Sequence, residues 1–108
     1  LSDQLRTDIT IISDPEVIPY SAVEGYTFYA KNTGKSELSL TYVDVIIDGM
    51  LLSPSNMTLS LADEGTVWST GDVLVIKAIT TPDPLDSGDH SIRVVTENGK
   101  SDSMSFKT

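Results

Sequence analysis

The chain has 108 residues, of which 39% are hydrophobic, and 7 Lys+Arg against 16 Asp+Glu give it a formal net charge of −9. This acidity disfavours nucleic acids and anionic membrane surfaces as partners, because proteins bind both through clustered Lys and Arg. With no Cys and a single histidine, His90, disulfides, Cys-ligated zinc and multi-histidine metal sites are excluded, so we expect neither an enzyme nor a cofactor-binding protein.

The first third of the chain has the pattern of short β-strands. Apolar residues alternate with polar ones in runs that end at turn residues, whereas the 3.6-residue spacing of helices is hard to find. Residues 8–12 and 26–30 are the first two runs, and in the second run three side chains share one face: Tyr26, Phe28 and Ala30. Residues 32–34, Asn-Thr-Gly, then predict a turn, because Asn and Gly tolerate positive φ.

The run from residue 38 to residue 47 changes phase in its middle. Its apolar positions shift from even to odd numbers: Leu38, Leu40 and Tyr42, then Val43, Val45 and Ile47. Because the faces of a strand alternate at every residue, this shift predicts either a β-bulge near Tyr42–Val43 or a strand that changes sheets there. Asp48–Gly49 then predicts a two-residue hairpin.

The second half continues in the same way. Residues 57–61 alternate, and residues 73–80 are apolar on both faces, which predicts a central strand that is covered on both sides. Residues 91–96 and 101–107 flank an Asn-Gly turn at 97–100, which predicts another hairpin. Seven or eight short strands with Gly and Pro turns predict an all-β fold, an immunoglobulin-like β-sandwich of seven to eight antiparallel strands in one domain, residues 1–108.

Two features could carry chemistry, and each also has a plain structural interpretation. Three carboxylates between Asp83 and Asp89 could bind calcium, but their spacing is not that of an EF-hand loop, and charged loops with Pro and Gly are usually solvated connectors. His90 follows this loop at the start of a predicted strand. A lone imidazole there is more often hydrogen-bonded locally than catalytic.

Trp68 and Asn56 have similar alternatives. A Trp next to an apolar strand most often fills the core of a sandwich, whereas an exposed Trp would favour sugar binding by ring stacking. Asn56-Met57-Thr58 matches the N-glycosylation motif beside a predicted turn, where an acceptor would be accessible. Asn56 is therefore a candidate glycosylation site.

Apolar residues exceed what one buried face per strand requires. A two-sheet sandwich buries one face of each sheet, so Ile46, Val95 and Ile12 should point outward unless bulges rotate them inward. Several exposed aliphatic side chains on one sheet would mark a surface for a partner.

Two segments resemble a known family. Residues 26–34, YTFYAKNTG, followed by residues 43–49, VDVIIDG, resemble the β-domain of archaeal flagellar proteins, which are the archaellins and the accessory proteins of the FlaF and FlaG type. The closing segment, residues 90–99, is more similar to FlaG than to FlaF. The likeness covers roughly half the chain, and the choice between accessory protein and filament subunit stays open, although the short length favours the former.

The resemblance implies a stator-like part of the archaellum, outside the cytoplasmic membrane and beneath the surface layer, anchored by an N-terminal membrane helix that is missing here. It implies assembly with itself and with a FlaF-like partner that contacts the surface layer. We expect the partner contact at the N-terminal edge, Asp8, Ile9, Thr10, Ile11 and Ile12, with Ile46 and Val95 as apolar contacts. The alternative is a cell-surface or carbohydrate-binding module that uses Trp68 and the loop carboxylates.

Overall fold

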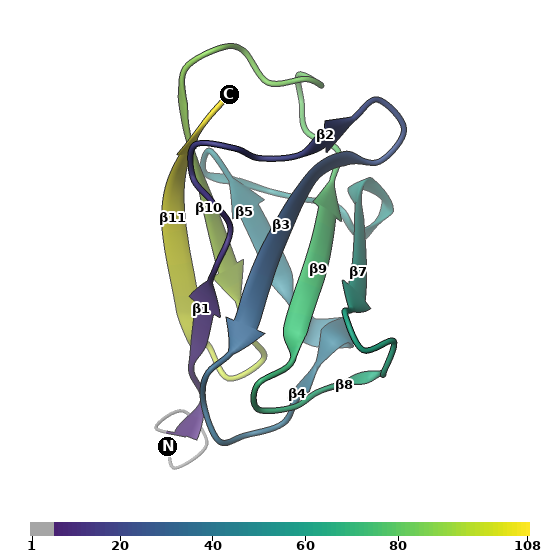
Figure 1. The fold of residues 1–108 in the computed structure, drawn as a ribbon, viewed down its shortest axis with the longest axis vertical. Helices are drawn as coiled ribbons and strands as arrows, with labels where there is room; N and C mark the ends of the chain where they lie inside the picture. Colours follow the sequence, from purple (N-terminus) through teal and green to yellow (C-terminus); the bar gives the residue numbers. More distant parts are fainter. Residues whose placement is uncertain (1–5) are drawn as a thin grey trace.

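The computed structural model describes residues 6–108 as two β-sheets packed face to face (Figure 1). Its elements are strands and two short 3-10 helices, in this order: β1 (Ile9–Ile11), β2 (Tyr20–Ser21), β3 (Gly25–Asn32), β4 (Leu38–Ser39), η1 (Leu40–Tyr42), β5 (Asp44–Ile47), β6 (Met50–Leu51), η2 (Pro54–Asn56), β7 (Met57–Leu61), β8 (Val67–Trp68), β9 (Val73–Ala78), β10 (Asp89–Val95) and β11 (Ser101–Lys107).

Every strand pairs with its neighbours in the antiparallel sense. The front sheet of Figure 1 has the order β1-β3-β9-β7, with β2 added to the end of β3, and the rear sheet has the order β11-β10-β5-β6. Strands β4 and β8 form a small third sheet. The expected all-β sandwich is confirmed. Seven of the described strands have three or more residues, and the others have two, too few to show an alternating pattern in the sequence.

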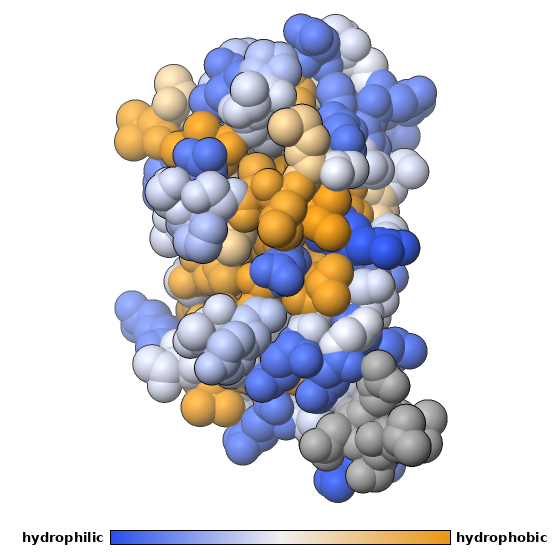
Figure 2. Space-filling view, turned by 180° about the vertical axis from the view of Figure 1, so that it is seen from behind, coloured by the Kyte–Doolittle hydropathy of each residue, from blue (hydrophilic) through white to orange (hydrophobic). Residues whose placement is uncertain are grey.

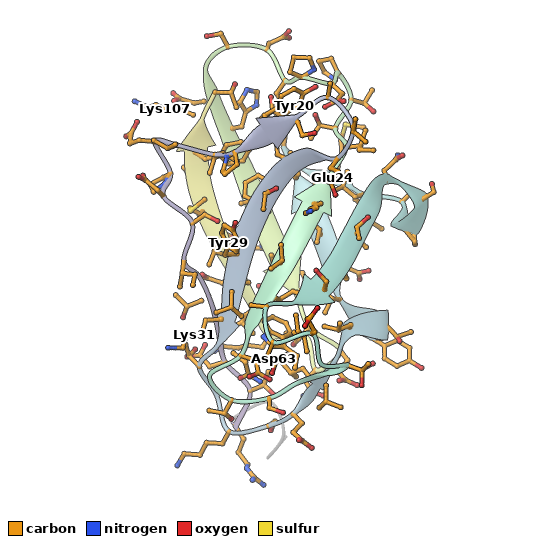
Figure 3. All side chains as sticks on the ribbon, turned by 45° about the vertical axis from the view of Figure 1, so that its right-hand side comes forward. Tyr20, Glu24, Tyr29, Lys31, Asp63 and Lys107 are labelled. Carbon is orange, nitrogen blue, oxygen red and sulfur yellow. The ribbon has the colours of Figure 1, made fainter. Side chains whose placement is uncertain are left out.

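The core lies between the two sheets and is built by strict alternation along the strands. In β3 the side chains of Tyr26, Phe28 and Ala30 are buried, as predicted, whereas Tyr29 and Lys31 project from the outer face (Figure 3). Phe28 meets Phe106 of the opposite sheet edge-to-face, with ring centroids 5.1 Å apart. The alternation that the sequence shows is therefore the division between core and solvent.

The phase shift near Tyr42 marks a change of sheet, which was the second of the two predicted explanations. The helix η1 separates β4, which pairs with β8, from β5, which belongs to the rear sheet. Val43, the first residue after η1, is buried, and from here to the end of β5 the buried residues have odd numbers. The predicted hairpin follows: Asp48 and Gly49 have φ of 52° and 81°, the two left-handed residues of a type I′ turn between β5 and β6.

The predicted turn at residues 32–34 exists, but for a different physical reason. Gly34 does not have a positive φ; a Cβ there would clash with the backbone of Asp8 and Arg6, which passes directly over it. Asn32 is completely buried, and its Nδ2 donates to the carbonyls of Ser36 and Trp68 at 2.9 Å each. This segment is a junction that ties three parts of the chain together.

Strand β9 is central, as predicted, but it is not covered on both faces. It lies between β3 and β7, and its inward side chains Leu74, Ile76 and Ala78 are completely buried. Val73, Val75 and Lys77 on the other face are only half-buried, because no second layer lies over them and they pack against side chains of the neighbouring strands. The prediction of a doubly covered strand was wrong on this point.

No helix within residues 6–108 has the length and apolar character that crossing a membrane requires.

Candidate interaction surface

The edge that the sequence pointed to, β1, is closed by carboxylates. In its register with β3, Thr10 pairs with Lys31 and the Ile12 N–H donates to the Tyr29 carbonyl, so the N–H groups of Ile9 and Ile11 point away from the sheet. The Ile9 N–H donates to Asp8 Oδ1 at 3.1 Å, and the Ile11 N–H donates to Asp102 Oδ2 at 2.8 Å. Both outward donors of this edge already have acceptors.

The side chains of the expected N-terminal contact set fall into two groups. Ile9 and Ile11 are core residues, 3% and 9% exposed, so a partner contact at these two positions would have to use their backbone groups. Their side chains face inward because β1 belongs to the front sheet and its odd-numbered residues lie on the face that packs against the rear sheet. Asp8, Thr10 and Ile12 are exposed. Strand β1 also lies beside β11, and the two strands close this side of the sandwich. We call this side, formed by β1 and β11, the closed seam.

The two other expected apolar contacts lie on the outer face of the rear sheet. Ile46 in β5 and Val95 in β10 are both half-buried. Ile46 stands between Arg93 and Leu51 in the ladder. Neither residue is rotated into the core.

The opposite side of the sandwich is open. There the edge strands are β6 of the rear sheet and β7 of the front sheet, and no further strand of the described chain pairs with either of them. Four half-buried apolar side chains pack against the core here and line a cavity: Leu40, Leu52, Met57 and Leu59. Three large apolar residues around it are strongly exposed: Tyr42 at 63%, Met50 at 61% and Leu51 at 64%. We call this group, with its two edge strands, the open seam.

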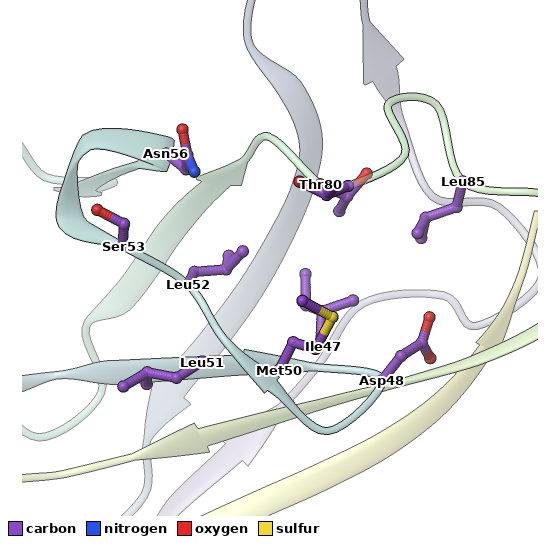
Figure 4. A pocket seen from close by; sticks show the side chains of 10 residues that line it. Ile47, Asp48, Met50, Leu51, Leu52, Ser53, Asn56, Thr80 and Leu85 are labelled. Carbon is purple, nitrogen blue, oxygen red and sulfur yellow. The ribbon is translucent and has the colours of Figure 1, made fainter.

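Two cavities lie along the open seam. One of about 180 Å³ lies between the β5–β6 hairpin and the segment after β9, with Ile47, Met50 and Leu52 at its wall (Figure 4). The other, of about 240 Å³, lies between η1 and β7 and is lined by Leu40, Met57 and Leu59. Leu51 and Leu52 contribute to both cavities, so one apolar ridge separates them.

Backbone groups on both edges of the open seam point outward. Along β7 the even-numbered residues pair with β9, since the Ile79 N–H donates to the Asn56 carbonyl and the Ala62 N–H donates to the Val73 carbonyl. The odd-numbered Met57, Leu59 and Leu61 therefore direct their N–H and C=O groups away from the sheet. In β6 the N–H and C=O groups of Leu51 also point outward, because it is the next residue, Leu52, whose N–H donates to the Val45 carbonyl of β5.

A signal for this surface was present in the sequence but was missed. Residues 49–62 contain no charged residue, although 21% of the whole chain is charged, and this run spans β6, η2 and β7. From behind, hydrophobic side chains gather across the middle of the molecule, on the face that carries the rear sheet (Figure 2). Uncharged edges around exposed apolar residues are typical of a protein interaction surface.

His90 lies at one end of the open seam and fixes the β5–β6 hairpin. Its Nδ1 is 2.6 Å from Asp48 Oδ2, and its Nε2 is 2.6 Å from the Asp86 carbonyl oxygen. Both partners only accept hydrogen bonds, so the protonated imidazolium can donate to both. The bond to the Asp86 carbonyl, followed by that to Asp48, raises the pKa of His90 above its usual 6.5. His90 is locally bonded, which agrees with its structural interpretation.

The other chemical candidates do not form a site. Within residues 6–108, no three His, Asp or Glu side chains are placed to hold a metal ion, and the Asp83–Asp89 loop is no exception. Trp68 is completely buried and its Nε1 donates to the Asp72 carbonyl at 2.9 Å. Trp68 therefore fills the core, and a sugar-binding function that uses its ring is contradicted.

Asn56 is exposed at the end of η2, immediately before β7. Its backbone is held on both sides, because its N–H donates to the Ser53 carbonyl and its carbonyl accepts from Ile79. Thr58, the third residue of the motif, is also exposed. The Asn56 side-chain amide, to which a glycan would be attached, lies at the rim of the open seam (Figure 4).

Comparison with known proteins shows the family. The family model for archaeal-type flagellin matches residues 1–106. The chain belongs to the archaeal-type flagellin family. Flagella-related protein G of Methanococcus voltae is 34% identical over 101 residues, which cover 92% of this chain and 65% of that protein. The chain thus spans about two thirds of the length of this relative, and the resemblance seen in the sequence is confirmed, with the FlaG type favoured.

The fold is also similar to that of a solved archaellum protein. The archaellum periplasmic stator protein FlaG from Sulfolobus acidocaldarius superposes with a TM-score of 0.61 at 22% identity, covering 93% of this chain and 99% of that one. At this identity the likeness supports the sandwich fold. The family and both relatives are components of the archaeal flagellum and not enzymes.

Proposed function

We propose that this archaeal-type flagellin family member is a stator-like, static part of the archaellum that acts outside the cytoplasmic membrane. The observation that carries the proposal is its similarity to flagella-related protein G along 92% of the chain. The stator protein FlaG that shares its fold supports the same role. A static part must resist torque, and two sheets joined through one dense core deform little under load.

The two seams have different tasks in this proposal: one holds the two sheets together, and the other offers a surface to partners. The closed seam, where Asp102 holds the Ile11 N–H and β1 lies beside β11, joins the two sheets. The open seam keeps apolar side chains and edge backbone groups accessible, which are the features that a strand-adding or apolar partner recognises. We infer that assembly with a second copy and with a FlaF-like sandwich protein uses exposed edges and apolar surface of this kind.

The remaining parts of the proposal concern position in the cell. We propose anchoring in the archaeal cell membrane through an N-terminal helix, and contact with the surface layer through the FlaF-like partner. The acidic surface, with a net charge of −9, suits a protein that must stay soluble outside the cell without binding nucleic acid.

Deleting the gene in a motile archaeon that encodes this chain tests the proposal. Cells should still assemble archaella, visible by electron microscopy, but should not swim, because the filament would turn without a fixed support. Reintroducing the full-length gene should restore swimming. Absence of filaments, together with this chain in purified filaments, would instead identify a filament subunit.

A further inference from the structure

The outer edge of β7 carries an unequal set of hydrogen-bonding groups. Leu59 offers both its N–H and its C=O. The Met57 N–H is used inside the chain by the Pro54 carbonyl, which leaves the Met57 carbonyl open. The Leu61 carbonyl accepts from the Glu64 N–H at 2.9 Å, which leaves the Leu61 N–H open. Acceptors are thus available at the start of the strand and donors at its end.

This arrangement is complementary to itself. If β7 of one copy lies antiparallel to β7 of another with a two-fold axis at Leu59, each Leu59 faces its counterpart and each Leu61 faces a Met57. The two Leu59 residues can exchange N–H···O=C bonds, and each open Leu61 N–H meets an open Met57 carbonyl. The Met57 N–H and the Leu61 carbonyl, which are already bonded within each chain, also face each other. The pairing therefore leaves no open donor or acceptor opposite a group that is already bonded.

Charge does not prevent the pairing, although both copies are strongly acidic. No residue from 49 to 62 is charged, and the first carboxylate, Asp63, follows β7 at the rim (Figure 3). Asp63 is four residues from the axis, so the two Asp63 residues would stand about 27 Å apart at ~3.4 Å per residue. That is well beyond the Debye length of about 8 Å at physiological ionic strength.

The side chains allow the same contact. Thr58 and Ser60 are exposed on the outer face, and the axis places each Thr58 opposite a Ser60, which gives two small polar pairs. Met57 and Leu59 point inward and line the cavity beside η1, so pairing would bring the apolar gaps of two copies together. No Lys or Pro protects this strand against addition of another strand.

We propose that two copies of this chain associate edge to edge through β7, in an antiparallel pair with its axis at Leu59, and so join their front sheets into one. This inference rests on the proposed self-assembly and assigns it to one strand. The contact is symmetric and closes as a dimer, which leaves the β6 edge and the rear face for a different partner.

Sedimentation of the unglycosylated 108-residue chain tests the assignment. The chain should dimerise with rising concentration, and Thr58→Lys/Ser60→Lys, which sets lysines opposite lysines across the axis, should weaken dimerisation at least tenfold. Thr58→Glu/Ser60→Lys sets opposite charges in the same places and should restore it. Thr10→Lys/Ser105→Lys adds the same charge at exposed positions elsewhere and should change dimerisation by less than twofold.

Amide exchange locates the contact independently. The Leu59 and Leu61 amides should become protected as concentration rises, whereas the Leu51 amide, on the other open edge, should stay unprotected. Dimerisation that the lysine pair leaves unchanged would overturn the β7 assignment and leave self-assembly intact. A monomer at every concentration, with free exchange at Leu59, would overturn both.

Discussion

Asp102 Oδ2 accepts a hydrogen bond from the Ile11 N–H at 2.8 Å, across 91 positions of sequence. The bond joins β11 of the rear sheet to the free edge of β1 in the front sheet. Together with the bond from the Ile9 N–H to Asp8 Oδ1, it leaves neither outward donor of β1 open, and in this respect the closed seam differs from the open seam. An edge whose donors are satisfied inside the chain gives an incoming strand little to bind.

Asp102→Ala should therefore destabilise the fold by about 1–2 kcal/mol, because it leaves the partly buried Ile11 N–H without an acceptor. Asp102→Asn keeps an acceptor oxygen and should lose clearly less. Urea unfolding measures both, and exchange of the Ile11 amide should accelerate only in the alanine variant. Equal stability of the alanine variant and the parent chain would contradict this account.

The His90 contacts predict a pH dependence. Because the Asp86 carbonyl and Asp48 raise the pKa of His90 in the folded state, its stabilising effect is complete below the unfolded value of 6.5 and is lost as the pH rises through the raised folded pKa. The unfolding free energy of the parent chain should thus fall relative to His90→Gln between pH 6 and pH 9, measured by thermal or urea unfolding. A difference that stays constant over this range would count against the imidazolium contact.

Asn32 predicts a sharp difference between two nearly isosteric side chains. Asn32→Asp replaces an amide that donates to the Ser36 and Trp68 carbonyls with a buried carboxylate that faces them, and should cost about 3 kcal/mol or more at pH 7. The loss should shrink at pH 4, where the carboxyl can bind a proton and donate one bond. As a control, Thr33→Ser at the exposed neighbouring position should change stability little.

For Asn56 we propose N-linked glycosylation, because its amide is exposed beside an exposed Thr58. In an archaeal host that glycosylates proteins, mass spectrometry of the peptide around Asn56 should show a glycan that Asn56→Gln and Thr58→Val abolish and Thr58→Ser retains. An unmodified peptide from that host would refute this. The sugar would stand at the first residue before β7, so it would also weaken the β7 contact.

Local pattern was sufficient for most of the strands. Alternation in β3 and β7, the Asp48–Gly49 turn and the β10–β11 hairpin follow from backbone sterics and the two-residue period of a strand, which act between near neighbours in sequence. The switch of phase at Tyr42 was readable as well, although only as a choice between a bulge and a change of sheet. The family resemblance lay in the same local segments.

Which edge is open could not be read from such patterns. Ile9 and Ile11 looked like accessible edge residues, yet their side chains face the core, and the carboxylates of Asp8 and of the distant Asp102 accept their outward N–H groups. Gly34 looked like a turn residue, yet its role is to let the Arg6–Asp8 backbone pass close by. The sequence determines the strands because their signals are local; the tertiary structure decides which edges and faces remain exposed, because that depends on contacts between residues that only folding brings together.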